Sequence, residues 1–189
     1  MAARALGALA AVLLLAAPPL LPKYPLEILI SILFFAYLGL AWNILGGYAG
    51  QFSFGHAAFF GIGAYTSTLL LLHAGVSPWL GMLAGGALAA AFGLFEGYLS
   101  FRYGLRGPYF SLVTLAFAEM LRVVSVNAKA VGASLGLVVP TGTPAPLLFV
   151  FAGKLPYYYV ILAMTGLALL ITGAVARGRL GYALIAVRE

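Results

Sequence analysis

Long apolar runs are the feature that most restricts the fold of this chain. Only 7% of its 189 residues are charged and 64% are hydrophobic, whereas about a quarter of the residues in a soluble domain carry charge. An apolar stretch of about 20 residues crosses the hydrocarbon core of a bilayer as a helix. The stretches that approach or exceed this length are 5–21, 26–45, 57–74, 78–100, 108–126 and 156–176. The sequence therefore predicts an all-α, polytopic transmembrane helical bundle with about six spans.

The first stretch, 5–21, has two interpretations. It follows Arg4 and ends in alanines and prolines, as the apolar part of a cleavable signal peptide does. We favour a true span, because the next apolar run begins almost at once and the loop charges then fit. With the N-terminus inside, the inner loops and ends carry Arg4, Arg102, Arg106, Arg177, Arg179 and Arg188, and the outer ones carry Lys23, Lys129 and Lys154. The positive-inside rule then makes 128–155 an external loop, and cleavage of the first stretch would leave this orientation unchanged.

Few side chains suited to catalysis or metal binding are present. The chain has no cysteine, two histidines and four carboxylates, so it offers no thiolate site and little for hydrolytic chemistry. We expect no catalytic residue, no metal and no cofactor. A glycine-rich phosphate loop of the GxxxxGK type is missing, so ATP hydrolysis would take place on a separate partner. The net charge of +6 belongs to loops beside membrane lipid, and nucleic acid is not an expected partner.

A polar, glycine-rich stretch separates the second and third spans. It reads GGYAGQFSFGHAAFFGIGAY (46–65) and contains Gln51, Ser53 and His56. Irregular backbone at membrane depth must be buried in protein or line a wet cavity. The stretch is therefore either a cytoplasmic connection, where polarity costs nothing, or a broken helix beside a translocation path, as in many transporters. Residue spacing leaves both interpretations open, and the three polar residues are candidates for a substrate path.

Charged residues also fall within the predicted spans. Glu119 lies near the middle of the fifth span and Arg122 follows three residues later, a spacing that places both on one helix face and allows an ion pair. Charges inside a membrane are rare and are functional candidates, so Glu119 is a further candidate for the substrate path. The alternative is a structural ion pair that holds the bundle together. Glu96 is expected to be an interfacial charge at the inner end of the fourth span, within reach of Arg102.

Small residues recur at the spacing typical of helix packing. The fourth span contains two GxxxG patterns, and the third has a face of small residues. Small faces allow helix backbones to approach closely in lipid. We expect helix packing at Gly61, Gly81, Gly85, Gly93 and Gly97.

Three stretches resemble a known family. LGLAWNILGGYAGQFSFGHAAFFGIGAYTSTLL (38–70) and LRGPYFSLVTLAFAEMLRVV (105–124) are similar to signature stretches of the M-type permease subunit of ATP-binding-cassette importers for branched-chain amino acids. The permeases for urea and short-chain amides have a similar pattern. RGRLGYALIAVRE (177–189) resembles the start of the cytoplasmic loop that docks on the ATPase. The matching positions are Gly181, Ala183, Ala186, Arg188 and Glu189.

The resemblance implies a permease that translocates branched-chain amino acids across the bacterial inner membrane. Its implied partners are cytoplasmic ATPase subunits, a second permease subunit and an external substrate-binding protein. Family members continue beyond the position of Glu189, so the resemblance implies that 1–189 is the N-terminal part of a single transmembrane permease domain. Two alternatives stay open: a permease for urea or short-chain amides, and a truncated membrane fragment that transports nothing.

Overall fold

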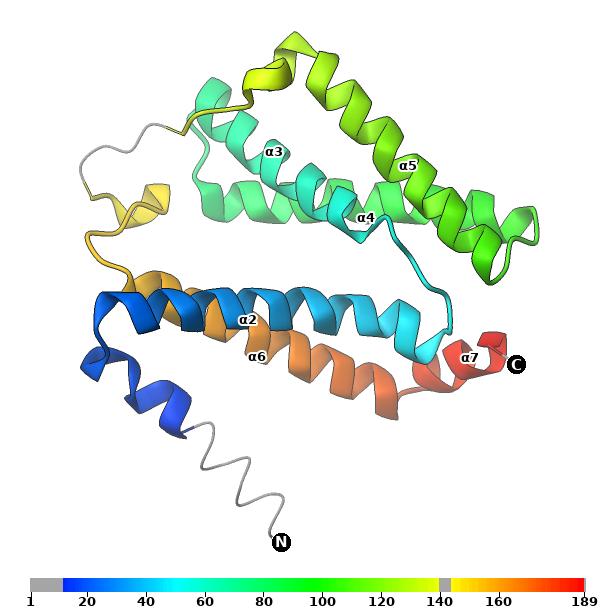
Figure 1. The fold of residues 1–189 in the computed structure, drawn as a ribbon, viewed down its shortest axis with the longest axis horizontal. Helices are drawn as coiled ribbons and strands as arrows, with labels where there is room; N and C mark the ends of the chain where they lie inside the picture. The colour runs from blue at the N-terminus through cyan, green and yellow to red at the C-terminus, as the bar shows by residue number, and fades with distance from the viewer. Residues whose placement is uncertain (1–11, 140–143, 189) are drawn as a thin grey trace, which may run out of the picture. The chain divides into compact units, whose positions relative to one another are not determined.

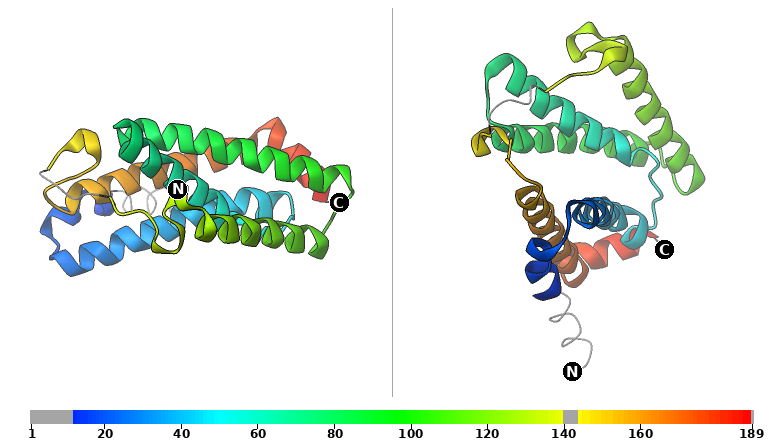
Figure 2. Two further views of the ribbon diagram at one scale, coloured as in Figure 1. Left: turned by 90° about the horizontal axis from the view of Figure 1, so that it is seen from above. Right: turned by 60° about the vertical axis from the view of Figure 1, so that its left-hand side comes forward.

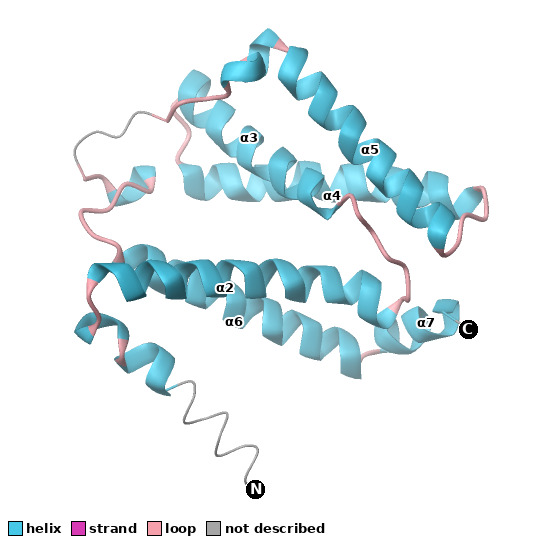
Figure 3. Cartoon of the chain, viewed as in Figure 1, coloured by secondary structure: helices cyan, strands magenta, loops and turns pink. Residues whose placement is uncertain are grey.

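The computed structural model describes residues 12–139 and 144–188 of the chain. In this part of the chain helices are joined by turns and loops, and no strand is present (Figure 3). The described residues divide into two compact units, one containing residues up to 41 together with 151–177 and the other containing 42–150 together with the residues from 178 onward.

Five helices of the described residues are long and apolar enough to cross a membrane. They are α2 (Lys23–Asn43), α3 (His56–Ala74), α4 (Pro78–Arg102), α5 (Pro108–Asn127) and α6 (Leu155–Arg177). The predicted fold class, an all-α polytopic helical bundle, is therefore confirmed. The first expected stretch, 5–21, lies partly outside the described residues. Its described part is helical at 12–16 and ends in a 3-10 turn, Pro18–Leu20. A shorter helix, α7 (Arg179–Arg188), follows α6.

In the first unit, α2 and α6 lie side by side, as the views in Figures 1 and 2 both show. Leu26, Leu33 and Tyr158 form a buried apolar cluster between them. The Thr165 hydroxyl donates to the carbonyl of Leu33 at 3.2 Å, and the Tyr158 hydroxyl donates to the carbonyl of Leu14 at 2.9 Å. Polar side chains thus join segments more than a hundred residues apart in the sequence.

In the second unit, α3 and α4 form a tight antiparallel pair. The turn between them begins at Gly75, which has a φ of 62°. Its N–H donates to the carbonyl of Leu71, and the N–H of Val76 donates to the carbonyl of Leu70, both at 3.1 Å. The bond from Gly75 is the 5→1 bond of the αL C-capping motif, which satisfies one of the last carbonyl groups of a helix and favours glycine at the left-handed position.

Gly81 and Gly85 bring α4 close to α3. A Cβ atom added at Gly81 would lie 2.6 Å from the Ser67 hydroxyl oxygen, and one added at Gly85 would lie 2.7 Å from the carbonyl oxygen of Gly63. In lipid, such close backbone approach provides the packing that holds helices together. These two glycines therefore lie at the contact between α3 and α4, the two helices that are labelled in Figure 1.

The other three glycines in the expected packing set lie differently. A Cβ at Gly93 would make an ordinary contact with the ring of Phe59 at 3.5 Å. A Cβ at Gly61 would meet nothing within 4 Å, and one at Gly97 would meet only Phe101 of its own helix. Among the described residues, Gly61 and Gly97 are thus not at a helix contact. This corrects the expectation from spacing, which identifies a small face but not the helix that covers it.

The described part of the expected external loop contains short 3-10 turns. They are Lys129–Val131, Ala133–Leu135 and Pro146–Leu148. The last is tied to the start of α4, because the Trp79 indole donates to the carbonyl of Pro146 at 3.1 Å.

Candidate translocation groove

Residues 49–55, which we call the strap, connect the end of α2 to the start of α3. The chain leaves α2 through a π-helical turn, Ile44–Tyr48 (the π-turn), and is then irregular as far as α3. The Trp42 indole N–H donates to the carbonyl of Ser53 at 2.9 Å, and its ring fills the space beside Gly46, where an added Cβ would lie 2.6 Å away. Single π-turns are rare and occur frequently at functional sites. Trp42 therefore holds the strap folded back against the turn that precedes it.

Hydroxyl groups of α5 bind the backbone of the strap. The Ser111 hydroxyl donates to the carbonyl of Phe52 at 2.6 Å, and the N–H of Phe54 donates to the Thr114 hydroxyl oxygen at 3.1 Å. Gly55 lies so close that an added Cβ would be 2.6 Å from the Thr114 carbonyl oxygen. Buried backbone polar groups must find hydrogen-bond partners within the protein, and these two hydroxyl groups supply them here. The strap therefore lies along the first two turns of α5, within about 9 Å of its start.

The polar residues that the sequence singles out in this stretch are largely buried. Gln51 and Ser53 are 5% and 3% exposed, and His56, the first residue of α3, is half-buried. Gln51 Oε1, Ser53 Oγ and His56 Nδ1 have no hydrogen-bond partner among the described residues. The described residues also contain no group of three or more side chains suited to holding a metal ion. The strap thus places polar groups inside the bundle.

The expectation for Glu96 is wrong. Glu96 is buried, with 6% of its surface exposed, whereas Arg102 is exposed and donates to the Tyr98 hydroxyl at 2.8 Å. Six residues correspond to about 240° around a helix, so Glu96 and Arg102 point in different directions. Ser100 is fully buried and, like Glu96 Oε1, its hydroxyl has no partner in the described part of the chain. The i,i+4 spacing of Glu96 and Ser100 is the signal that would have identified a buried polar face on α4.

A groove of about 460 Å³ lies between α3 and α5. Gly61 and neighbouring small residues form its α3 wall, and Leu115 belongs to its α5 wall. Phe54 of the strap lines one end, whereas Ala128 and Val131, beyond the end of α5, line the other. The open space beside Gly61 is explained by this groove. Small-molecule sites are clefts of about 300–1,000 Å³ with mainly apolar walls and a few polar groups, and the α3–α5 groove fits that description.

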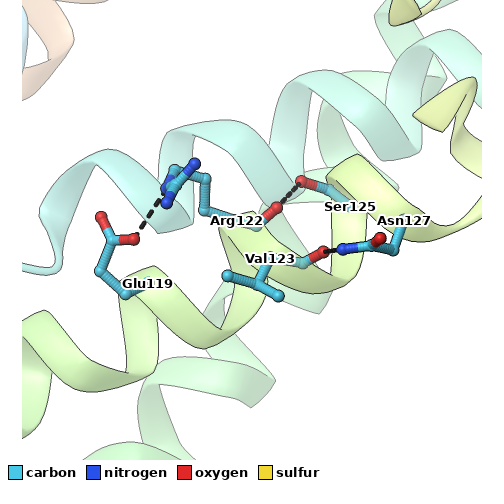
Figure 4. A network of polar contacts seen from close by, with 5 residues as sticks. All are labelled: Glu119, Arg122, Val123, Ser125 and Asn127. Atoms are coloured by element: carbon cyan, nitrogen blue, oxygen red, sulfur yellow. Dashed lines mark hydrogen bonds and ion pairs between the residues drawn. The ribbon is translucent and has the colours of Figure 1, made fainter. Parts of the chain in front are cut away.

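Glu119 and Arg122 supply the charged groups of the α3–α5 groove. Arg122 Nε donates to Glu119 Oε2 at 2.7 Å, and the two side chains remain 54% and 64% exposed. Figure 4 shows the pair with its polar neighbours, where the Ser125 hydroxyl donates to the carbonyl of Arg122 and the Asn127 amide to that of Val123, both at 2.8 Å. The pair thus joins two adjacent turns of α5 and stays accessible from the groove.

Of the residues expected to dock on an ATPase, most lie on α7. This helix contacts the π-turn. Gly181 is buried, and Ala183 and Ala186 are exposed. The side chain of Arg188 and all of Glu189 lie outside the described residues.

Sequence reasoning missed the residues that bind the strap. Trp42, Ser111 and Thr114 carry these contacts. Ser111 and Thr114 share a helix face at i,i+3 spacing, and that polar face in an otherwise apolar span is the signal that would have found them.

Comparison with known proteins gives consistent matches. The sequence model of the family described as "Branched-chain amino acid transport system / permease component" matches residues 24–189. The high-affinity branched-chain amino acid transport system permease protein LivM of Escherichia coli (strain K12) is 34% identical over 116 residues, which are 61% of this chain and 27% of the relative. LivM of Salmonella typhimurium (strain LT2) is 33% identical over 116 residues, with the same shares. The match thus spans about a quarter of these relatives' length. No solved structure matches the chain significantly.

Proposed function

We propose a transport function from the fact that this chain belongs to the branched-chain amino acid transport system permease family. It is a permease subunit of an ATP-binding-cassette importer for branched-chain amino acids. The observation that carries the proposal is the family match over residues 24–189, which includes nearly all of the five helices able to span a membrane. The chain is accordingly a multi-pass protein of the bacterial inner membrane.

The proposed partners follow from the importer architecture. Cytoplasmic ATPase subunits would hydrolyse ATP, because this chain has no phosphate-binding loop of the GxxxxGK type. A second permease subunit and an external substrate-binding protein would complete the importer. The permease itself makes and breaks no covalent bond. It alternates between two packings of the helices, and the free energy of binding the amino acid differs between them.

The α3–α5 groove is the proposed path within this subunit. With the orientation expected from the positive-inside rule, the end at Ala128 and Val131 faces outward and the end at the strap faces inward. An amino acid delivered from outside enters the open end and stops at Phe54. The hydrogen bonds of Ser111 and Thr114 hold the strap there, so release to the inside requires the strap to move.

The contact between α7 and the π-turn suggests how a conformational change of the ATPase would be transmitted to the strap. A shift of α7 on the ATPase would displace the π-turn, which continues directly into the strap. Ala183 and Ala186, which are exposed on α7, would form part of the docking surface, with Arg188 and Glu189 continuing it. Gly181 is buried and would take part only through the packing of α7. The coupling is then carried by one continuous set of packed elements.

Uptake of labelled leucine tests this function. The gene is expressed with its neighbouring importer genes in cells that lack their own branched-chain amino acid uptake, with and without this chain. We expect uptake only when the chain is present, with competition by isoleucine and valine and none by urea or acetamide. Uptake of labelled urea or acetamide that depends on this chain, with none of leucine, would favour the amide permease. The absence of chain-dependent uptake of leucine, urea and acetamide alike would contradict a transport role.

A further inference from the structure

We propose that the Glu119–Arg122 pair binds the charged backbone of the transported amino acid, with Glu119 accepting from its ammonium group and Arg122 donating to its carboxylate. This proposal rests on the proposed function and deepens it by naming the binding site. The apolar side chain of the amino acid would lie against Leu115 and the small residues around Gly61, which line the same groove.

The ion pair leaves atoms available for such a ligand. It uses Nε of Arg122 and Oε2 of Glu119. Glu119 Oε1 and the two terminal nitrogens of Arg122 make no further hydrogen bond or ion pair within the described part of the chain. A guanidinium group donates to a carboxylate through two parallel N–H groups, and a carboxylate accepts from an ammonium group on its second oxygen. A zwitterion therefore completes both groups without breaking the bond between them.

The charge of the site also selects the ligand. Glu119 and Arg122 together are neutral, so the pair attracts a ligand that carries both charges and gives little attraction to a ligand with one charge. A single charge moved into an apolar groove would lose its hydration without full compensation. The neutral ion pair therefore selects a zwitterion, and the apolar walls of the groove select an apolar side chain.

The position of the pair suits a site reached from the outer end of the groove. Glu119 lies about 16 Å from the start of α5, and Arg122 lies about 8 Å from its end. The pair is thus between the strap and the open end at Ala128. The competing explanation is that Arg122 extends to the membrane interface, as long basic side chains do, and that the pair only stabilises α5.

The test uses two preparations. The permease and ATPase subunits in nanodiscs, without the external substrate-binding protein that would itself bind leucine, give the binding of labelled leucine and the melting temperature. The complete importer in liposomes gives uptake. Glu119→Gln and Arg122→Gln each remove one charge. The swap Glu119→Arg with Arg122→Glu keeps an i,i+3 ion pair but exchanges the places of its charges. Arg106→Gln is the matched control, because Arg106 is exposed in the turn between α4 and α5 and does not line the groove.

We expect each single variant to weaken leucine binding by about 10- to 100-fold, as loss of a charged hydrogen bond does. The swap is expected to melt like the wild type and still bind leucine at least about 10-fold more weakly, and the control to bind normally. Competition by 4-methylpentanoate, which lacks the ammonium group, should become relatively stronger in Glu119→Gln, because the repelling carboxylate is gone.

The outcomes separate this proposal from the function on which it rests. Normal leucine binding by the swap or by both single variants would overturn the site and leave the transport function standing. Binding that depends on the pair, in an importer that shows no uptake, would support the site and refute transport. Absence of leucine binding with normal uptake would overturn the site alone, and absence of both binding and uptake would refute both.

Discussion

Replacing Gly85 with alanine is expected to force α3 and α4 apart. The added Cβ would lie 2.7 Å from the carbonyl oxygen and 2.9 Å from the Cα of Gly63. Both obstacles are backbone atoms, so no change of rotamer relieves the contact and one helix must move. Overpacking of this kind costs about 1–3 kcal/mol.

Gly86→Ala is the matched control for this variant. Gly86 is the next residue in α4, and a Cβ there would meet nothing within 4 Å. Both replacements gain helix propensity of about 1 kcal/mol, so this gain cancels in the comparison. With about 2–4 °C for each kcal/mol in a protein of this size, Gly85→Ala should melt about 2–12 °C below Gly86→Ala. Melting in detergent, followed by tryptophan fluorescence, gives the values, and equal melting temperatures would refute the close approach of the two helices.

Three further predictions concern the strap, the orientation and the first unit. Gly55→Ala should loosen the strap, since its Cβ would lie 2.6 Å from the Thr114 carbonyl oxygen; faster hydrogen exchange of 51–55 by mass spectrometry is expected, and an unchanged rate would contradict the contact. Cysteines introduced at Tyr103 and Leu135 should differ in labelling by an impermeant thiol reagent on intact cells, with only position 135 labelled. Labelling of position 103 would show that the chain has the opposite orientation. Thr165→Val removes a hydrogen bond to a carbonyl of α2 and should cost about 0.5–1.5 kcal/mol in thermal melts, whereas no loss would show that this bond does not hold α2 to α6.

The spans are the part of the fold that sequence reasoning reaches most directly. Bilayer thickness sets the length of an apolar helix, and proline favours the first turn. The expected spans 78–100 and 108–126 begin at the same prolines as α4 and α5, at Pro78 and Pro108. Local spacing also indicates the approach of Glu119 and Arg122, because residues three apart share a helix face.

The strap and the groove depend on contacts that local spacing does not contain. The strap binds hydroxyl groups about 60 positions away in the sequence, and its polar, glycine-rich pattern is equally suited to a solvated connection. Gly61 is a second residue whose surroundings cannot be predicted from local spacing. Its small face is visible in the sequence, but whether that face meets a helix or lines a groove depends on how far α5 lies from α3. For Glu96, the short chain distance to Arg102 suggests that the two side chains meet, but the helical angle of about 240° between them points them in different directions.

Protection of a cysteine at Gly61 by leucine is the most direct test of the central claim, that an amino acid occupies the α3–α5 groove. The chain has no cysteine of its own, and Gly61 lines the groove with open space at its Cβ position. Leu135→Cys is the control, because residue 135 is 93% exposed and does not line the groove. In the complete importer, we predict that saturating leucine slows modification of position 61 by a small thiol reagent and leaves position 135 unaffected. Equal modification rates at position 61 with and without leucine, in an importer shown to take up leucine, would contradict the claim.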